Sequence, residues 1–432
     1  MPSSINRPRG TIDVLPGEVE KWQYVEESFR RICREYGYAE IRTPVFEYTE
    51  LFDRGVGETT DIIEKEMYTF LDRSERSLSL RPEGTAPIAR AYVEDKLFSG
   101  PQPVKVYYQG PMFRYDRPQA GRYRQFHQLG IEVFGAFSPA IDAEVIAMSM
   151  DFCRRFGLKL DLHINSVGCG VCRPVMREKL YAGLRTRLED LCEDCRLRLE
   201  RNPLRILDCK EKRCRGMAEE AAAGLNFLCP ECGDHFEKVR NYLDVLDVKY
   251  IVDHCLVRGL DYYTRTAFEI MAPGIGAQRS VGGGGRYDGL VEMFGGPPTP
   301  GIGYAMGLER LLLVMQEQGL PVPCSGRLDV YIVTAEAELE GKALRLLQEL
   351  RGNGMHADKD YAGRSMKAQL KQAGKSGAPF VVILGSDELR RGKVALKDML
   401  SGSQTEVPLA DLVATVTGEI DTHFTKVRRF KG

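Results

Sequence analysis

Apolar and polar residues alternate along residues 125–135, QFHQLGIEVFG, with the period of two that is typical of a half-buried β-strand. One face of this strand carries three aliphatic side chains: Leu129, Ile131 and Val133. The other face carries a ring, an amide and a carboxylate: Phe126, Gln128 and Glu132. We expect the first face to pack in a core and the second to offer polar chemistry.

Helical periodicity predicts an amphipathic helix over residues 18–37. The segment from residue 78 to residue 134 reads as strands interrupted by a helix that begins near Gly84, with Pro87 in its first turn. An acid and a hydroxyl, Glu83 and Thr85, stand at this strand-to-helix turn. Two interpretations remain open, because these side chains fit either a ligand site or ordinary capping with Thr85 as the N-cap.

Residues 301–315, GIGYAMGLERLLLVM, predict a glycine-rich strand that runs into a helix. The helix has an apolar stripe formed by Leu308, Leu311, Leu312 and Met315. Arg310 lies nearly opposite that stripe. It therefore faces either water or a cleft beside the glycine strand.

The 432 residues are too many for one ordinary core, so we expect several domains. Eight of the twelve cysteines crowd into a charged, helix-prone stretch, which indicates an insertion because strand patterns resume at residue 256. Beyond a Gly- and Pro-containing linker, strands and helices alternate as in a compact α/β domain. The expected division is a first core segment at 1–166, an insertion at 167–254, a second core segment at 255–317, a linker at 318–326, an α/β domain at 327–420 and a basic tail at 421–432.

Composition is that of a folded protein, with 28% charged and 43% hydrophobic residues. The formal net charge of −1 means that a nucleic-acid partner would need a local basic surface. No apolar run approaches the length of a membrane span, and the first residues lack the hydrophobic core of a signal peptide. We therefore expect a cytoplasmic protein without a membrane partner.

An arginine-rich loop follows the strand that ends near Arg114. Guanidinium groups pair phosphate oxygens through two parallel hydrogen bonds, so a loop that also carries Arg117, Arg122 and Arg124 suits a phosphate ligand. A solvated basic hairpin tip is the alternative.

The stretch LVRGLDYYTRTAFEI, residues 256–270, reads as a strand that carries Arg258, Tyr262 and Tyr263 between its apolar ends. An edge strand with solvated charges would explain it in isolation. Four consecutive glycines follow at 282–285, where the missing Cβ atoms allow close approach to a ligand or to a neighbouring strand. The sequence contains neither a complete P-loop motif nor a GxGxxG motif after a strand, which argues against a dinucleotide fold.

Taken together, these stretches resemble the histidyl-tRNA synthetase family of class II aminoacyl-tRNA synthetases. GYAEIRTPVFEYTELF is similar to motif 1, with its proline at Pro44; FRYDRPQAGRYRQFHQLGIEVFG is similar to motif 2, and GIGYAMGLERLLL to motif 3. RGLDYY and SVGGGGRYDGLV are similar to stretches particular to the histidine enzyme. The resemblance covers nearly the whole chain.

The resemblance implies ATP-dependent ligation of histidine to tRNA(His) through a histidyl-adenylate, with Mg²⁺. It places histidine against the residues that match Glu83, Gly84, Thr85, Gln128, Glu132, Arg258, Tyr262 and Tyr263. It places ATP against the residues that match Arg114, Asp116, Arg122, Phe126 and Arg310. The residues that match Arg258 and Arg114 supply the positive charge for catalysis in the family. Arg117 and Gln119 match loop residues that contact the tRNA acceptor end. One departure is Asp116, where class II motif 2 usually has a glutamate.

The implied fold is α+β: an antiparallel six-stranded sheet flanked by helices, dimeric through motif 1, followed by the helical insertion and a mixed-sheet anticodon-binding domain. The implied partners are tRNA(His), histidine, ATP and a second copy of the chain, with no membrane and no DNA. Two rival classes share some of these features. One is a non-catalytic regulatory subunit of ATP phosphoribosyltransferase, and the other is an RNA-binding module without catalysis.

The insertion carries three CxxC pairs, Cys169/Cys172, Cys192/Cys195 and Cys229/Cys232, and a looser pair, Cys209/Cys214. Thiolate pairs at this spacing suit tetrahedral Zn²⁺. Reduced cysteines can instead be small buried apolar residues, and the family's active site needs no zinc. The sequence leaves both interpretations open.

Overall fold

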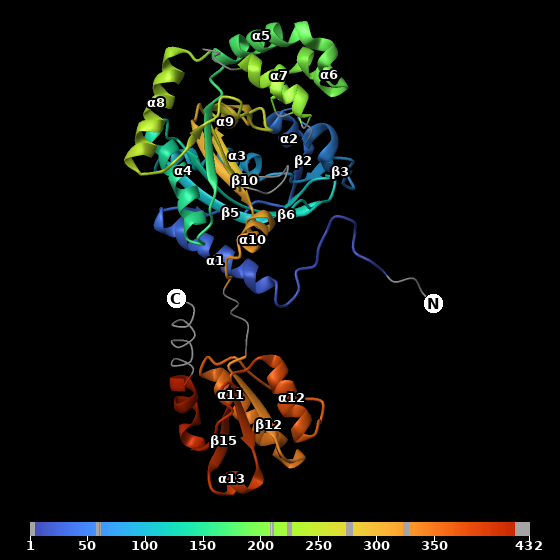
Figure 1. The fold of residues 1–432 in the computed structure, drawn as a ribbon, viewed down its shortest axis with the longest axis vertical. Coiled ribbons are helices and arrows are strands. Elements are labelled where there is room, and N and C mark those ends of the chain that lie inside the picture. Colours follow the sequence, from blue (N-terminus) through green and yellow to red (C-terminus); the bar gives the residue numbers. More distant parts are fainter. Residues whose placement is uncertain are drawn as a thin grey trace. The chain divides into compact units, whose positions relative to one another are not determined.

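The structure is a computed structural model that describes residues 5–57, 60, 62–207, 209, 211–222, 227–273, 280–322 and 328–419. The chain divides into two compact units, Met1–Pro323 and Cys324–Gly432, both drawn in Figure 1. Within the expected linker, residues 323–326 lie outside the described residues, as does the whole expected tail 421–432.

The first unit is built on an eight-stranded sheet whose six central strands are antiparallel, which confirms the expected fold. A two-residue strand joins each edge in parallel. In spatial order the strands are β1 (Ala39–Glu40), β5 (Val104–Phe113), β6 (Gln125–Phe134), β11 (Gly301–Gly307), β10 (Ser280–Arg286), β9 (Thr264–Met271), β7 (Asp161–Ser166) and β8 (Ile251–Val252).

One face of this sheet is covered by four helices: α1 (Val19–Glu35), α4 (Pro139–Arg154), α8 (Pro230–Val245) and α10 (Leu308–Glu317). Their apolar stripes pack with the inward face of β6, where Leu129, Ile131 and Val133 are buried as the alternation predicts. The helix expected at 18–37 is α1, and its buried residues recur with helical spacing. This face is the main core of the unit.

The opposite face of the sheet is covered less completely. Two helices pack on it, α3 (Thr85–Glu94) and α9 (Leu290–Met293), beside a tyrosine pair that precedes β9. Around them lie the short elements α2 (Thr49–Val56), the π-helical turn Ile62–Glu66, the 3₁₀ turn Leu97–Ser99, and a small antiparallel sheet ordered β2 (Phe46–Tyr48), β4 (Ser77–Leu80), β3 (Tyr68–Leu71). The uncovered area of this face is where polar side chains gather.

Helices of the expected insertion form a cluster with its own apolar core. They are α5 (Cys172–Leu184), α6 (Glu193–Arg201) and α7 (Lys212–Ala222), joined by the 3₁₀ turns Arg185–Asp190 and Pro203–Ile206. The last part of the expected insertion packs on the large sheet instead of on this cluster. Helix α8 contributes Val239 and Leu243 to the main core, and β8 pairs with the large sheet. By packing, the helical cluster therefore ends before α8.

The second unit has a five-stranded mixed sheet, in agreement with the expected anticodon-binding fold. Its strands are β13 (Ala357–Lys359), β12 (Val330–Thr334) and β14 (Phe380–Leu384), which are parallel, then β15 (Lys393–Asp398) and β16 (Gln404–Pro408), which are antiparallel. The sheet is buried on both faces, with α11 (Glu340–Gly352) in one apolar core and α12 (Met366–Ser376) beside the other. Smaller elements are α13 (Ser386–Arg390) and the 3₁₀ turns Ala337–Leu339 and Leu409–Asp411.

Among the described helices, none combines the length and the apolar character that crossing a lipid bilayer would require.

A fully buried carboxylate, Asp142 on α4, joins four elements of the first unit. Arg286, at the end of β10, donates from Nε to one carboxylate oxygen at 2.8 Å. Thr266 on β9 donates its hydroxyl at 2.6 Å, and Nε2 of His235 on α8 lies 2.9 Å away. Arg286 and Asp142 are both completely inaccessible to solvent, so their charges compensate each other without help from water.

We expect Asp142→Asn to lower the free energy of unfolding of the first unit by about 3 kcal/mol, because the buried Arg286 loses its buried carboxylate partner and keeps only the partly exposed Asp288. The single tryptophan, Trp22, lies in the main core, so its fluorescence during urea denaturation reports on this unit. The matched control is Glu35→Gln, which breaks an exposed pair with Arg155 and should change stability by less than about 1 kcal/mol. Equal effects of the two variants would contradict the assignment.

Candidate active site

A cavity of about 320 Å³ opens on the less covered face of the large sheet, over β5, β6, β9, β10 and β11. Most residues expected to bind substrates line it, although they come from distant regions of the chain. The lining includes Glu83, Thr85, Arg114, Asp116, Arg122, Phe126, Gln128, Arg258, Tyr262, Tyr263 and Arg310. Four expected residues do not line it: Gly84, Arg117, Gln119 and Glu132.

Positive charge is concentrated in the cavity by Arg114, Arg122 and Arg310. Arg114 follows β5 and donates from Nε to the carbonyl of Pro82 at 2.8 Å. Arg310, on the first turn of α10, donates to the carbonyl of Ser280 at 2.8 Å. Burial lowers the pKa of Arg310, and the nearby charges of Arg122 and Arg114 lower it further. An anionic ligand would relieve this repulsion, so the cavity suits phosphate groups.

The arginine-rich loop between β5 and β6 is held partly by Asp116. Its carboxylate pairs with Arg122 and accepts a hydrogen bond from the backbone N–H of Arg117 at 2.6 Å. The backbone N–H of Gln119 donates to the carbonyl of Arg122 at 3.1 Å and closes the turn. Arg117 and Gln119 thus lie on the loop outside the cavity, while Asp116 and Arg122 face it.

Arg258 lies in an irregular segment, because β9 covers only Thr264–Met271 and not the whole strand expected at 256–270. Its Nη1 donates to the carboxylate of Glu269 at 3.2 Å. Burial opposes the charge, but Tyr263 and Glu269 raise the pKa of Arg258 above its usual value. A Cβ atom at Gly283 would come within 2.8 Å of Nη1, so the glycine strand makes room for this guanidinium.

Three buried polar atoms on the cavity wall have no hydrogen-bond partner among the described residues. They are the carbonyl oxygen of Gln128, Nε of Arg258 and the hydroxyl of Tyr108. A buried polar atom without a partner is unfavourable, and in native structures it calls for an explanation such as a ligand. An amino acid would supply both an ammonium donor and a carboxylate acceptor.

The turn before α3 is capped by Glu83, whose carboxylate accepts the backbone N–H groups of Thr85 at 2.7 Å and Ala86 at 2.8 Å. Thr85 is therefore not the N-cap considered from the sequence, since Gly84 occupies that position and Thr85 is the first helical residue. Burial raises the pKa of Glu83. A Cβ atom at Gly84 would overlap the ring of Tyr108, which explains the glycine.

Glu132 lies behind the cavity wall rather than in it, and only 1% of it is exposed. Its carboxylate accepts hydrogen bonds from the hydroxyl of Thr85 at 2.7 Å and from the hydroxyl of Tyr287 at 2.5 Å. Burial raises the pKa of Glu132 to about 8. Each carboxylate oxygen has a further lone pair, so these two bonds leave capacity for another donor.

Sequence reasoning missed several residues that line the cavity, among them Tyr108, Glu269 and Tyr287. Tyr287 follows the four glycines closely, so its position beside a ligand strand could have been suspected. Tyr108 lies on β5 and Glu269 on β9, and both belong to strands whose partners are distant in sequence. Their roles become visible once the strand order brings them to one cavity.

An antiparallel sheet of this order, with a charged cavity on one face and a separate mixed-sheet domain, has the architecture of class II aminoacyl-tRNA synthetases. The histidyl-tRNA synthetase family model matches residues 10–311, and an anticodon binding domain model matches residues 329–419. The chain belongs to the histidyl-tRNA synthetase family.

Individual relatives agree with this assignment over nearly the full length. The histidine–tRNA ligase of Desulforamulus reducens is 63% identical over 408 residues, which cover 94% of this chain and 97% of the relative. That of Pelotomaculum thermopropionicum is 62% identical, with 93% and 95% covered. Among solved structures, the apo histidyl-tRNA synthetase of S. aureus has a TM-score of 0.80 and 42% identity, and covers 96% of this chain and 100% of its own.

The raised pKa of Glu132 predicts a pH-dependent stability. The folded protein keeps this proton up to about pH 8, whereas an exposed glutamate loses it near pH 4.3. The stabilising contribution is thus complete below about pH 4.3 and is lost as the pH rises through about 8. We expect the free energy of unfolding to fall relative to that of Glu132→Gln across this window, by at most about 1.4 kcal/mol per pH unit. Trp22 fluorescence in urea measures both proteins, and parallel pH profiles would contradict the prediction.

Proposed function

We propose that this chain ligates L-histidine to tRNA(His) in two steps, using the cavity described above. A histidine carboxylate oxygen attacks the α-phosphorus of ATP, so that a new P–O bond forms as the bond to pyrophosphate breaks. The terminal hydroxyl of the tRNA then attacks the carbonyl of the adenylate and releases AMP. The observation that carries this proposal is the cavity itself, where buried arginines stand beside unpaired polar atoms that suit an amino acid.

Histidine would occupy the end of the cavity near the tyrosine pair. Its ammonium group would meet Glu83, Thr85 and the unpaired carbonyl oxygen of Gln128, with the backbone of Gly84 in the same turn. Neutral imidazole has one donor and one acceptor, so the carboxyl group of Glu132 and the hydroxyl of Tyr263 are suitable partners.

The pocket wall adds support to this placement of histidine. The rings of Tyr262 and Tyr263 lie 4.8 Å apart and are both buried, which gives the imidazole an apolar enclosure. Arg258 would reach the histidine carboxylate and the α-phosphate through its unpaired Nε.

ATP would occupy the arginine-lined end. Arg114 would bind the α-phosphate and Arg310 the γ-phosphate side, with adenine stacked between Phe126 and Arg310. Arg114 and Phe126 lie together at this end of the cavity, since the guanidinium carbon of Arg114 is 5.3 Å from the ring centre of Phe126. Arg122 would add charge, and its partner Asp116 would approach the adenine amino group through water.

Mg²⁺ fits the residues present. It binds proteins through one or two carboxylates together with substrate phosphates, and the cavity wall offers the carboxylate of Glu269, which also accepts a hydrogen bond from Arg258. When bound, the ion would neutralise charge on the phosphates. Arg114 and Arg258 would stabilise the negative charge that grows on phosphorus, so no side-chain nucleophile is needed.

The tRNA would contact two regions of the chain. Arg117 and Gln119 lie on the loop beside the cavity and would meet the acceptor end. The second unit would bind the anticodon, in keeping with the family model matched over residues 329–419. The functional division would follow the one expected from the sequence. It comprises a catalytic core in two segments (1–166 and 255–317), the cysteine-rich insertion (167–254), a linker (318–326), the anticodon-binding domain (327–420) and a basic tail (421–432).

A homodimer is supported by exposed apolar side chains around motif 1. They lie on or beside the small sheet and comprise Val45, Phe46, Tyr48, Phe70 and Leu71. Several exposed large apolar side chains on one small sheet are typical of a protein–protein interface. The cytoplasm, where tRNA is charged, is the expected compartment.

The main alternative is a non-catalytic regulatory subunit with the same core. Such paralogues lack the anticodon-binding domain, whereas this chain has one. Histidine-dependent exchange of pyrophosphate into ATP tests the proposal, because it requires reversible adenylate formation. A purified, folded protein without this exchange would favour the regulatory alternative.

We expect Arg258→Ala to slow adenylate formation by a free-energy change on the order of 3 kcal/mol, as for the loss of one preorganised donor. Arg258→Lys should recover only some of the rate, because a point charge cannot hold phosphate and carboxylate together. Pre-steady-state adenylate formation measures both variants. Near-normal rates in both would return Arg258 to a purely structural pairing with Glu269.

A protein that ends at Pro323 should keep adenylate formation and lose most charging of tRNA. The first unit has its own core and contains the whole cavity, while the second unit carries the expected anticodon reader. Pyrophosphate exchange serves as the internal control for folding. Unchanged charging by the truncated protein would show that the second unit does not read the tRNA.

A further inference from the structure

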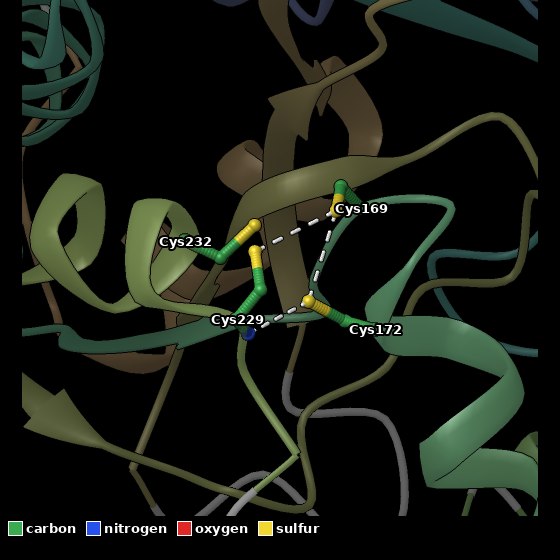
Figure 2. Close-up of side chains that lie close together, drawn as sticks. All are labelled: Cys169, Cys172, Cys229 and Cys232. Atoms are coloured by element: carbon green, nitrogen blue, oxygen red, sulfur yellow. Dashed lines mark hydrogen bonds between the residues drawn. The ribbon is translucent and has the colours of Figure 1, made fainter.

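Eight cysteines around the helical insertion form two separate groups of four. Cluster A consists of Cys169, Cys172, Cys229 and Cys232, and cluster B consists of Cys192, Cys195, Cys209 and Cys214. Within each cluster, the four sulfur atoms all lie within 4.8 Å of one another. Figure 2 shows the four thiol side chains of cluster A turned toward one another, from the loop after β7 and from the starts of α5 and α8.

The sulfur spacing is that of ligands around a single tetrahedral metal ion. In cluster A, the sulfur of Cys169 lies 3.7 Å from that of Cys172 and 3.9 Å from that of Cys229. In cluster B, the sulfurs of Cys192 and Cys209 are 3.9 Å apart. Four ligands at a Zn–S distance of about 2.3 Å would be separated by about 3.8 Å, the edge of the tetrahedron. A disulfide requires about 2.05 Å, so these thiols are not bonded to each other.

We propose that cluster A and cluster B each bind one structural Zn²⁺ through four thiolates. Four protein ligands leave no open position, which is the mark of a structural site rather than a catalytic one. Iron–sulfur clusters fit less well, because several metal atoms between the cysteines would hold the sulfurs farther apart.

Hydrogen bonds around the sulfurs support thiolates rather than neutral thiols. In cluster A, the backbone N–H of Cys229 donates to the sulfur of Cys172 at 3.1 Å, and Arg265 donates to the sulfur of Cys232 at 3.4 Å. In cluster B, the backbone N–H of Cys192 donates to the sulfur of Cys214 at 3.2 Å. Such donors partly neutralise the charge of a four-thiolate zinc site and orient its ligands.

Apolar packing of reduced cysteines is the competing explanation, and partial exposure argues against it. Cys169, Cys192 and Cys229 are only half-buried, although each lies against the other sulfurs of its cluster. A small apolar residue gains from burial among carbon atoms and has no reason to gather with three other thiols at a partly wet site. A metal ion supplies that reason.

The two sites would have different structural roles. Cluster B lies within the helical cluster, where Cys195, Cys209 and Cys214 belong to the insertion's own core. Cluster A lies where the chain enters and leaves the insertion, between β7 and α8. Cluster B would therefore hold the insertion together, and cluster A would attach it to the large sheet.

Cluster A is also linked to the segment that carries Arg258 and the tyrosine pair. Arg173, next to Cys172, donates to the carbonyl of Asp261 at 2.9 Å. Arg265, which bonds Cys232, donates its backbone N–H to the carbonyl of Gly168 at 2.9 Å. The metal at cluster A would thus fix the chain on both sides of the tyrosine pair and position the histidine pocket without touching the substrate.

Metal content is the direct test, and it does not depend on the proposed function. Full-length protein expressed with zinc and purified under reducing conditions should contain two zinc ions per chain by elemental analysis. A thiol-blocking mercurial should release both, and Co²⁺ substitution should give the visible bands of tetrahedral thiolate coordination. Protein with no stoichiometric zinc, or with disulfides within the clusters by mass spectrometry, would overturn the proposal, and a single ion would overturn one site.

Single-residue variants assign the ions to their sites. Cys232→Ser should lose the ion of cluster A and Cys214→Ser that of cluster B, so each variant should retain one ion. Cys255→Ser is the matched control, because this half-buried cysteine belongs to neither cluster and both ions should remain. Cys232→His keeps a zinc ligand and should restore two ions if the serine variant misfolds. Two ions in either serine variant would contradict its assignment.

The positioning role rests on the proposed function and has a separate readout. Cys232→Ser should raise the KM for histidine several-fold in pyrophosphate exchange while the KM for ATP stays near normal, and Cys232→His should reverse the change. Cys214→Ser should leave both values near those of the parent protein. Equal effects of the two serine variants would show that cluster A does not position the pocket, whereas absence of exchange in the parent protein would instead contradict the proposed function.

Discussion

The buried pairing of Asp142 with Arg286 is the interaction on which the arrangement of the first unit depends. It joins α4 on one face of the sheet to the end of the glycine strand β10, and the same carboxylate also holds β9 and α8. Because neither charge reaches solvent, moving α4 away from β10 would leave the carboxylate of Asp142 without its arginine partner. The position of β10 then fixes where Gly283 leaves space for Arg258.

The cavity shows a different electrostatic arrangement, because Arg114 and Arg310 form no ion pair with a described residue, whereas Arg122 and Arg258 pair with Asp116 and Glu269. Arg114 and Arg310 make their structural hydrogen bonds to backbone carbonyls, which orient the guanidinium groups without neutralising them. Holding like charges together under partial burial opposes folding. An anionic substrate removes this repulsion as it binds, so some of its affinity originates in the relief of that repulsion rather than in new contacts.

The hydrophobic pattern of the sequence correctly predicted which side chains of individual strands and helices face the core. The alternation in β6 correctly predicted that Leu129 faces the core and Gln128 the opposite face. Helical spacing correctly placed Arg310 away from the apolar stripe of α10. The irregular course of the chain around Arg258 was not predicted, because it follows from packing against β10 rather than from the residues themselves. The pattern of the sequence also suggested four cysteine pairs, but which pairs meet depends on how helices far apart in sequence fold back on each other.

Cluster A closes the helical insertion into a loop, because cysteines 57 positions apart along the chain meet at its base. The entropy of closing such a loop grows only slowly with the number of residues inside it. Segments between Cys172 and Cys229 could therefore lengthen, shorten or exchange during evolution with little loss of stability in the sheet below. The four cysteines of cluster A would then have to stay in place, whereas the helices between Cys172 and Cys229 could change in length and sequence.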